Sequence, residues 1–293
     1  MNRTIFPLLL ALIFTLSCSN PGSDQSTKKA EAEAEWIPIF NGTDLNGWYT
    51  YMRQPEPASE VPGMARDESG HYTEPIGLNK DPLAVFTVVE VDQAPAIRIS
   101  GEVFGILVTE KEYENYHLKL QFKWGSRKYP PRENELMDSG ILYHSIGKEG
   151  AWGGVWMKSL ECQVMEAACG DYISVDTVMA DIPARQNESD GRYYYTPGAE
   201  RMVFSPERSY CDASSEPEKA HGEWNTMEIY TYKGESVHLV NGQVVMHLFN
   251  SRQLIDGKEA PLTKGKIQLQ SEGAEIYYRD IQLMPITGIP ENV

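Results

Sequence analysis

Short runs of alternating apolar and polar residues occupy most of the chain between residues 84 and 284. The run from Tyr116 to Trp124 is the clearest, because Leu118, Leu120 and Phe122 share one face and the lysines and glutamine between them share the other. No segment has the apolar stripe of a long amphipathic helix. Roughly a dozen short strands without intervening helices predict an all-β fold, a β-sandwich.

Turn residues separate these runs and set their limits. Asn241-Gly242 joins two strand-like runs and predicts a tight hairpin. Residues 55–81 and 126–137 are rich in proline and charge, and we expect surface loops there. Residues 171–195 are less regular, and residues 200–220 are loop-like.

The first residues have the pattern of an export signal. A positive start at Arg3 precedes a short apolar run, and Ser17-Cys18 ends it in the manner of a bacterial lipoprotein signal. This resemblance implies cleavage before Cys18, lipidation of its thiol and a cell-envelope location, in the outer membrane or periplasm. An ordinary secretory signal is the alternative. We therefore expect a signal peptide at residues 1–17, a polar tether at 18–35 and a single domain at 36–293.

The charge of the chain excludes several classes of partner. Its formal net charge is −16, and removal of residues 1–17 would take away one further positive charge, that of Arg3. Nucleic acids and anionic lipid surfaces need clustered lysine and arginine, so a membrane contact is expected only through the lipid anchor. Motifs of serine hydrolases, nucleotide enzymes and zinc proteases are absent from the sequence.

Three cysteines remain if Cys18 carries lipid. An odd number in an exported chain leaves at least one free thiol. A disulfide between Cys162 and Cys169, or between Cys169 and Cys211, is compatible with the count.

Two strand-like runs carry the main candidate site. In the second run, the period of two places Glu161 and Gln163 on one face, with Cys162 and Val164 on the other. The apolar pair should face the core, so we expect Glu161 and Gln163 on the concave face of the larger sheet. In the first run, residues 138–145, His144 shares a face with Leu142, and we expect its imidazole to approach Glu161.

Other interpretations of these residues stay open. An acid on an antiparallel strand is most often a solvent-facing residue. Glu161 and Glu166 also resemble the two catalytic acids of laminarinase-type glycosidases, which need a β-bulge to bring both onto one face. Asp138 is suited to capping a turn.

Aromatic residues surround this stretch. Tyr143, Trp152, Trp156 and Tyr172 are suited to stacking against sugar rings, although most aromatic residues of a domain lie in its core.

Several motifs together are similar to those of the 3-keto-disaccharide hydrolase domain family. They are the opening FNGTDLNGW at residues 40–48, DSGI at 138–141, LECQV at 160–164, GEWN at 222–225, the hairpin VNG at 240–242, GKIQLQ at 265–270 and YRDI at 278–281. The matches run in order from about residue 36 to residue 287.

The resemblance implies a concanavalin A-like jelly-roll sandwich that acts on glycosides already oxidised at C3 of the sugar. Such chemistry needs a base for the C2 proton, and Glu161 or His144 is suited to that role, with the other acting as an acid. Lys123 or a bound divalent cation would stabilise the enolate. The further substrate-binding candidates are Gln163, Asp138, Tyr143, Trp156 and Gln270.

Overall fold

The computed structural model describes residues 35–293. The expected signal peptide, Cys18 and almost all of the expected tether lie outside the described residues. Within residues 35–293 all regular structure is strand, and no helix in this range has the length and hydropathy needed to span a membrane.

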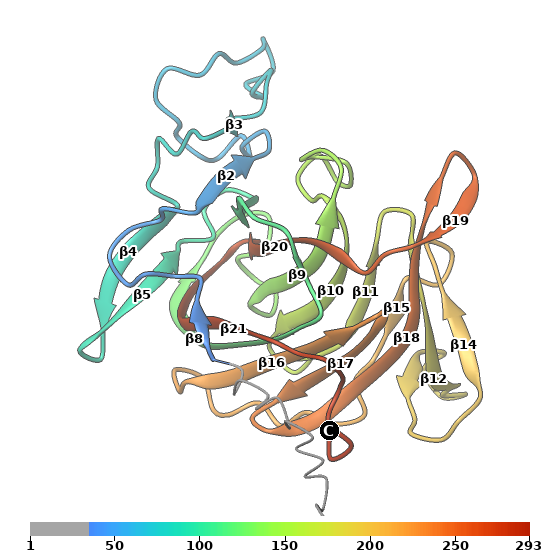
Figure 1. The fold of residues 1–293 in the computed structure, drawn as a ribbon. Coiled ribbons are helices and arrows are strands. Elements are labelled where there is room, and N and C mark those ends of the chain that lie inside the picture. Colours follow the sequence, from blue (N-terminus) through green and yellow to red (C-terminus); the bar gives the residue numbers. More distant parts are fainter. Residues whose placement is uncertain (1–34) are drawn as a thin grey trace, which may run out of the picture. The chain divides into compact units, whose positions relative to one another are not determined.

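The strands form two sheets in which neighbouring strands run antiparallel, so the predicted all-β sandwich is confirmed (Figure 1). The larger sheet has twelve strands: β1 (Ile37–Pro38), β4 (Phe86–Val91), β5 (Ala94–Ile99), β8 (Tyr116–Lys128), β12 (Val178–Gln186), β13 (Tyr193–Tyr195), β14 (Arg201–Phe204), β16 (Asn225–Tyr232), β17 (Glu235–Val240), β18 (Gln243–Ile255), β19 (Lys258–Pro261) and β21 (Ala274–Pro285).

The smaller sheet carries the candidate site. Its nine strands are β2 (Trp48–Met52), β3 (Gly77–Leu78), β6 (Gly105–Thr109), β7 (Tyr113–Glu114), β9 (Asp138–Ile146), β10 (Lys158–Met165), β11 (Tyr172–Val175), β15 (Tyr210–Cys211) and β20 (Lys264–Ser271). The main path through this sheet is β15-β11-β10-β9-β20-β6-β2-β3, so β9 and β10 lie near its centre.

The main core fills the space between the two sheets. β10 contributes Leu160, Cys162 and Val164, and β8 contributes Leu118 and Phe122 from the opposite sheet, all fully buried. Burying a leucine or valine side chain in this way stabilises the fold by about 1.5–3 kcal/mol each. The inward direction predicted for Cys162 and Val164 is therefore confirmed.

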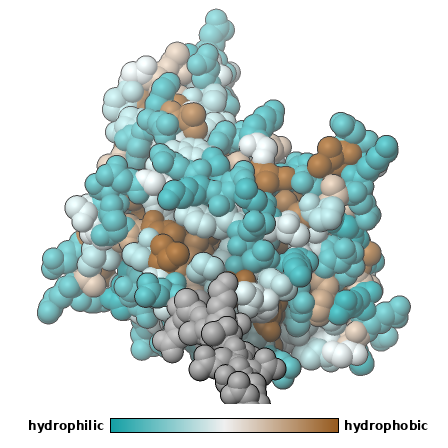
Figure 2. Space-filling model, viewed as in Figure 1, coloured by the Kyte–Doolittle hydropathy of each residue, from teal (hydrophilic) through white to brown (hydrophobic). Residues whose placement is uncertain are grey.

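A second apolar cluster covers the outer face of the nine-stranded sheet. Ile106, Leu142 and Trp156 are buried there, together with Val108, Val155, Met157 and Val175. The segment between β9 and β10 folds over this face, and a hydrogen bond of 2.7 Å from the Tyr49 hydroxyl to Glu149 Oε1 ties it to β2. These apolar side chains therefore shield part of the outer face near the candidate site from water. At the molecular surface in the same view, apolar residues form only small separate patches (Figure 2).

Two segments expected to be irregular contain strands. β11 and β12 occupy most of residues 171–195, and β14 and β15 lie within residues 200–220. β12 extends the edge of the larger sheet by pairing with β18, β13 and β14. Apolar and polar residues do not alternate regularly along β12, so its sequence pattern did not predict a strand.

The long loop between β2 and β4 projects beyond the sheets and has a fixed internal structure (Figure 1). The Arg66 guanidinium donates hydrogen bonds to the carbonyl oxygens of Pro57, Ser59 and Gly70 and to the Tyr72 hydroxyl. Tyr72 is buried, and its hydroxyl also donates to the Ser59 carbonyl. Apart from the two residues of β3, the predicted surface loop is confirmed.

The three cysteines of the described chain are free and buried. Neither of the disulfides considered from the sequence, Cys162–Cys169 or Cys169–Cys211, is present. Burial raises the pKa of the thiols of Cys162 and Cys169, which favours their neutral form.

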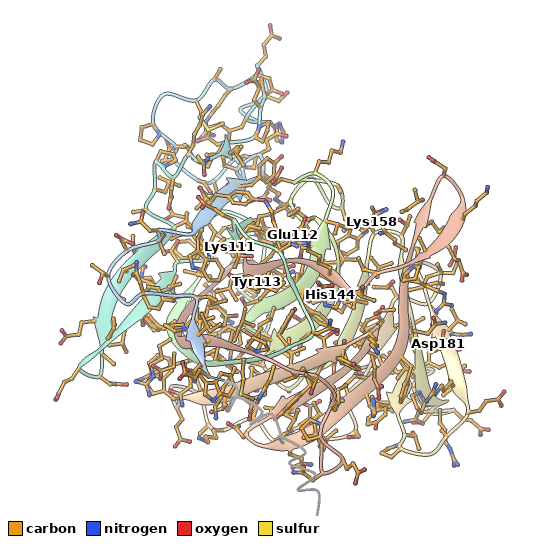
Figure 3. The ribbon with its side chains drawn as sticks, viewed as in Figure 1. Lys111, Glu112, Tyr113, His144, Lys158 and Asp181 are labelled. Carbon is orange, nitrogen blue, oxygen red and sulfur yellow. The ribbon has the colours of Figure 1, made fainter. Side chains whose placement is uncertain are left out.

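His144 points into the core and not toward Glu161, contrary to the prediction. A bulge between Lys158 and Leu160 shifts the β9–β10 register next to His144, whose φ of 50° is left-handed. His144 Nε2 lies 3.3 Å from the Thr231 hydroxyl of the opposite sheet, and its ring packs edge-on against Tyr116. The residue is fully buried in the sandwich interior, unlike the labelled Lys158 and Asp181 (Figure 3).

We expect His144→Ala to destabilise the fold by about 2–4 kcal/mol, because it opens a cavity in a packed core. Urea unfolding measures this, with the exposed His71→Ala as the matched control. Burial lowers the pKa of His144 to about 4 from 6.5, so its contribution is complete above pH 6.5 and is lost as pH falls toward 4. The variant should therefore lose less stability than wild type over that pH range. An unchanged urea midpoint would contradict the assigned position.

Candidate functional site

Three carboxyl groups lie close together at the outer face of the nine-stranded sheet. Glu161 comes from β10, Asp138 is the first residue of β9, and Glu272 follows the end of β20. Glu161 and Asp138 are 2% and 4% exposed, and Glu272 is half-buried. The charges of Asp138 and Glu272 both act on Glu161. The sheet pairing therefore gathers acids from three neighbouring strands.

Gly140 leaves the space in which Glu161 sits. A Cβ added to Gly140 would lie 2.4 Å from Glu161 Oε1 and 2.4 Å from Gln270 Oε1. Both oxygens thus occupy the volume over the glycine, one from each flanking strand. Any larger residue at this position would displace the carboxyl group or the amide.

The pKa values of this group are raised by burial. Desolvation, followed by the charges of Glu272 and Asp138, holds the pKa of Glu161 well above its usual range, and a hydrogen bond from Gln270 opposes the rise. Burial raises the pKa of Asp138 to about 7, although the Arg132 charge lowers it. Burial and the Asp138 charge raise the pKa of Glu272 to about 8. Burial and mutual repulsion therefore favour the protonated form of all three carboxyl groups.

Two arginines partly balance the acids. Arg132 Nη2 lies 2.6 Å from Asp138 Oδ2. Arg53 stacks on the Phe104 ring with 4.0 Å between guanidinium and ring centroid, pairs with Glu56 at 2.5 Å, and its charge lowers the pKa of Glu272. Both cations are held by packing and by a carboxylate, which fixes their position before any ligand binds.

Several polar atoms of this group have no hydrogen-bond partner among the described residues. They are Asp138 Oδ1, Gln270 Oε1 and Arg132 Nε, all buried. Buried polar atoms are usually satisfied, so this concentration marks a place where a ligand or a proton supplies the missing contacts. A protonated Glu161 would offer such a donor next to Gln270.

The other predicted site residues on this face are Gln163 and Trp156. Gln163 shares the Glu161 face as predicted, and its Oε1 accepts a hydrogen bond of 3.0 Å from the Val164 N–H. Trp156 is 4% exposed and stacks on Phe104 with 6.4 Å between ring centroids. Its ring covers apolar surface beside the acids. The strands belong to the smaller sheet, so the expectation of the larger sheet was wrong.

Tyr143 and Lys123 lie elsewhere. Tyr143 is fully buried between the sheets, where its hydroxyl lies 3.0 Å from His238 Nε2. Lys123 belongs to β8 of the other sheet, and its Nζ donates a hydrogen bond of 2.9 Å to Asp92 Oδ2. Because Phe122 and Trp124 face the core, Lys123 faces the outside of the larger sheet. Neither side chain shares the face of Glu161.

Glu166 does not join Glu161 on one face. Leu160 to Met165 pair with β9 without interruption, so the bulge that the glycosidase arrangement needs is not between the two acids. Glu166 Oε2 accepts a hydrogen bond from the Met137 N–H, and Oε1 lies 3.1 Å from His221 Nδ1. The two acids therefore have separate sets of partners.

The sequence did not single out Arg53, Arg132 or Glu272. Arg53 and Arg132 lie in or beside irregular loops, and Glu272 lies in the turn before β21, where no periodicity assigns a face. The available signal was position alone: Arg53 directly follows β2 and Glu272 directly follows β20, whereas Arg132 lies within the loop between β8 and β9. Among residues 35–293, no group of three or more histidine, cysteine or acidic residues is arranged to hold a metal ion.

We expect Glu161→Gln to raise stability at alkaline pH. A raised carboxyl pKa means that the folded state favours the protonated form, so this contribution is complete below about pH 4.5 and is lost as pH rises. Glutamine is neutral throughout, so the gain in Tm over wild type should grow from pH 5 to pH 9. Each kcal/mol of added stability raises Tm by about 2–4 °C. Thermal unfolding at several pH values measures it, with the exposed Glu90→Gln as control. A pH-independent difference would show that the Glu161 pKa is not raised.

The chain is similar to several solved structures. A protein of Parabacteroides distasonis ATCC 8503 with a provisional description as a glycosyl hydrolase is 18% identical, covers 86% of this chain and 94% of its own, and gives a TM-score of 0.43. The carbohydrate binding module CBM66 from Bacillus subtilis is 7% identical over 68% of this chain and 91% of its own, with a TM-score of 0.39. These similarities are distant and carry no argument about function.

Comparison with curated proteins finds no match. The domain comparison does find one, over residues 35–284, to the 3-keto-alpha-glucoside-1,2-lyase-like domain. This match includes the whole acidic cluster and every strand of both sheets except the last residue of β21. The chain therefore belongs to the 3-keto-disaccharide hydrolase family, as its motifs had predicted.

Proposed function

We propose that the protein is an enzyme that cleaves glycosides whose sugar is already oxidised to a ketone at C3. Family membership supports a function in glycoside processing. The observation that carries the finer proposal is the buried Glu161 carboxyl over Gly140, with a pKa raised well above its usual range. A general base for a weakly acidic C–H bond works best with a pKa near the working pH.

The proposed reaction begins at C2 of the keto sugar. The C3 ketone acidifies the C2 proton, and a base removes it to give an enolate. The enolate re-forms the ketone as the C1–O bond breaks and a C1–C2 double bond forms. The departing oxygen takes a proton and leaves as an alcohol. Water then adds across the double bond, with its oxygen on C1 and a proton on C2, and completes the hydrolysis.

In this scheme Glu161 is the base, and Gln270 orients its carboxylate. Arg132 is better placed than Lys123 to stabilise the enolate oxygen, because it belongs to the same cluster as Glu161. Asp138 and Glu272 are the candidates for the acid that protonates the departing oxygen, since each has a pKa of about 7 or 8. His144 has no part in the scheme, because it lies in the core.

We expect the purified protein to cleave a 3-keto-disaccharide and to leave the unoxidised parent disaccharide intact. Glu161→Gln should lower kcat by about 10²–10⁴-fold, the usual contribution of a general base. The kcat/KM of wild type should rise as pH increases above the usual range of a carboxyl group, because the base must be deprotonated, and should fall again as Asp138 or Glu272 loses the proton that the departing oxygen needs. Product formation followed by chromatography measures both effects, with Glu90→Gln as the matched control.

Other outcomes separate the alternatives. Cleavage of the parent sugar would indicate an ordinary glycosidase, and binding without turnover would indicate a glycan-binding protein. Full activity in Glu161→Gln would remove the residue from the mechanism. Repeating the assay with a chelator tests the alternative in which a bound divalent cation stabilises the enolate.

We also propose that the mature chain is anchored in the cell envelope by lipid at Cys18. The support is the positive start, the short apolar run and Ser17-Cys18 in the sequence. Mass spectrometry of the mature N-terminus should find cleavage before Cys18 and a lipid mass on it, and Cys18→Ser should release the protein from membranes. An unmodified Cys18 at the N-terminus, or cleavage elsewhere, would exclude the anchor.

A further inference from the structure

A cavity of about 590 Å³ opens at the β2 end of the row of strands that carries the acidic cluster. Tyr51, Arg53 and Gln54 line it from the end of β2, Glu56, His71 and Tyr72 line it from the long loop, and Gly153 and Gly154 line it from the segment before β10. This volume lies within the range of pockets that hold small ligands.

The pairing of strands connects this cavity to Glu161. Tyr51 pairs with Ile106, and Ile106 pairs with Gln270, so the three residues form one row across the sheet. Gln270 then meets Glu161 over Gly140. At the ordinary strand spacing of about 4.8 Å, Tyr51 lies about 10 Å from Gln270 and about 14 Å from Gly140, over which the Glu161 carboxyl lies. A leaving group attached to a sugar ring at Glu161 would extend along this row toward the cavity.

Arg53 belongs to both places. It lines the cavity, and its charge acts on Glu272 of the acidic cluster. The Phe104 ring beneath Arg53 and the ion pair with Glu56 hold the guanidinium at the boundary between them. The long loop that forms one wall of the cavity is also held in place, because the side chains of Arg66 and Tyr72 make hydrogen bonds within it.

We propose that this cavity is the subsite for the leaving group, the part of the substrate that departs with the C1 oxygen, and that this part is a sugar. The inference rests on the function proposed above. A sugar fits the lining, which combines the part-exposed Tyr51 ring for stacking with guanidinium, amide and imidazole groups for hydroxyl contacts. The long loop thus determines which keto-glycosides are accepted.

A second cavity provides the matched control. It has a volume of about 520 Å³ and lies toward the β15 end of the same sheet, where Tyr210, Glu207 and Met165 line it. Gln54 and Glu207 are both exposed, so a tryptophan at either position fills one cavity without entering the core. Comparing the two variants separates the leaving-group subsite from the opposite end of the sheet.

The test compares a 3-keto-disaccharide with methyl 3-keto-glucoside, whose leaving group is too small to reach the cavity. We expect Gln54→Trp to lower kcat/KM for the disaccharide about tenfold or more and to leave the methyl glycoside within about twofold. Glu207→Trp should leave the ratio of kcat/KM for the disaccharide to kcat/KM for the methyl glycoside unchanged. If Gln54→Trp folds poorly, the milder Tyr51→Phe and Gln54→Ala serve as the test, and each should lower this ratio.

Equal effects on both substrates, or a change of ratio only in Glu207→Trp, would overturn the subsite. Wild type that cleaves neither substrate would instead overturn the proposed reaction. In that case, calorimetric binding of the keto-disaccharide to wild type and to Gln54→Trp decides the subsite separately. Equal affinity of the two proteins for this sugar would overturn it.

Discussion

The uninterrupted pairing of β9 with β10 determines which side chains of the site face outward. From Leu160 to Met165 each residue has a partner on β9, so Glu161 and Gln163 must share the outer face while Cys162 and Val164 enter the core. A slip of one residue would bury a carboxylate between the sheets and expose a cysteine. The bulge at Lys158 ends this regular pairing, and beyond it the rule that would place His144 outside no longer holds.

Charge balance in the cluster explains why the pKa values of its acids are raised. Three carboxyl groups meet two arginines, and Arg53 and Arg132 each also pair with a glutamate, Glu56 and Glu135. The arginines are therefore too few to hold all three acids ionised in a buried setting, and the protein compensates by keeping protons on some of them. Such an arrangement reduces stability at neutral pH, and its resemblance to functional sites is one support for the proposed role of Glu161.

Much of the fold was predictable from the sequence, because strand periodicity and the Asn241-Gly242 hairpin are local signals. The shared face of Glu161 and Gln163 followed from the same period and is confirmed. The site itself was less predictable. His144 was misplaced because a bulge depends on the pairing of two strands, and Arg53, Arg132 and Glu272 were missed because contacts of loop residues depend on how distant segments pack. Strands such as β12 escaped prediction because their pairing partners, and not their own pattern, stabilise them.

The apolar cluster on the outer face supplies the remaining condition for the site. Tyr49 from β2, Ile106 from β6 and Val155 from the segment before β10 come from distant parts of the chain, yet together they exclude water beside the strand that carries Glu161. The hydrogen bond between Tyr49 and Glu149 keeps this cover closed. Desolvation is the largest cause of the raised Glu161 pKa, so the cover acts on the acid by excluding water. Packing on the outside of a sheet, where sandwiches usually meet solvent, thus sets the acidity on which the proposed proton abstraction depends.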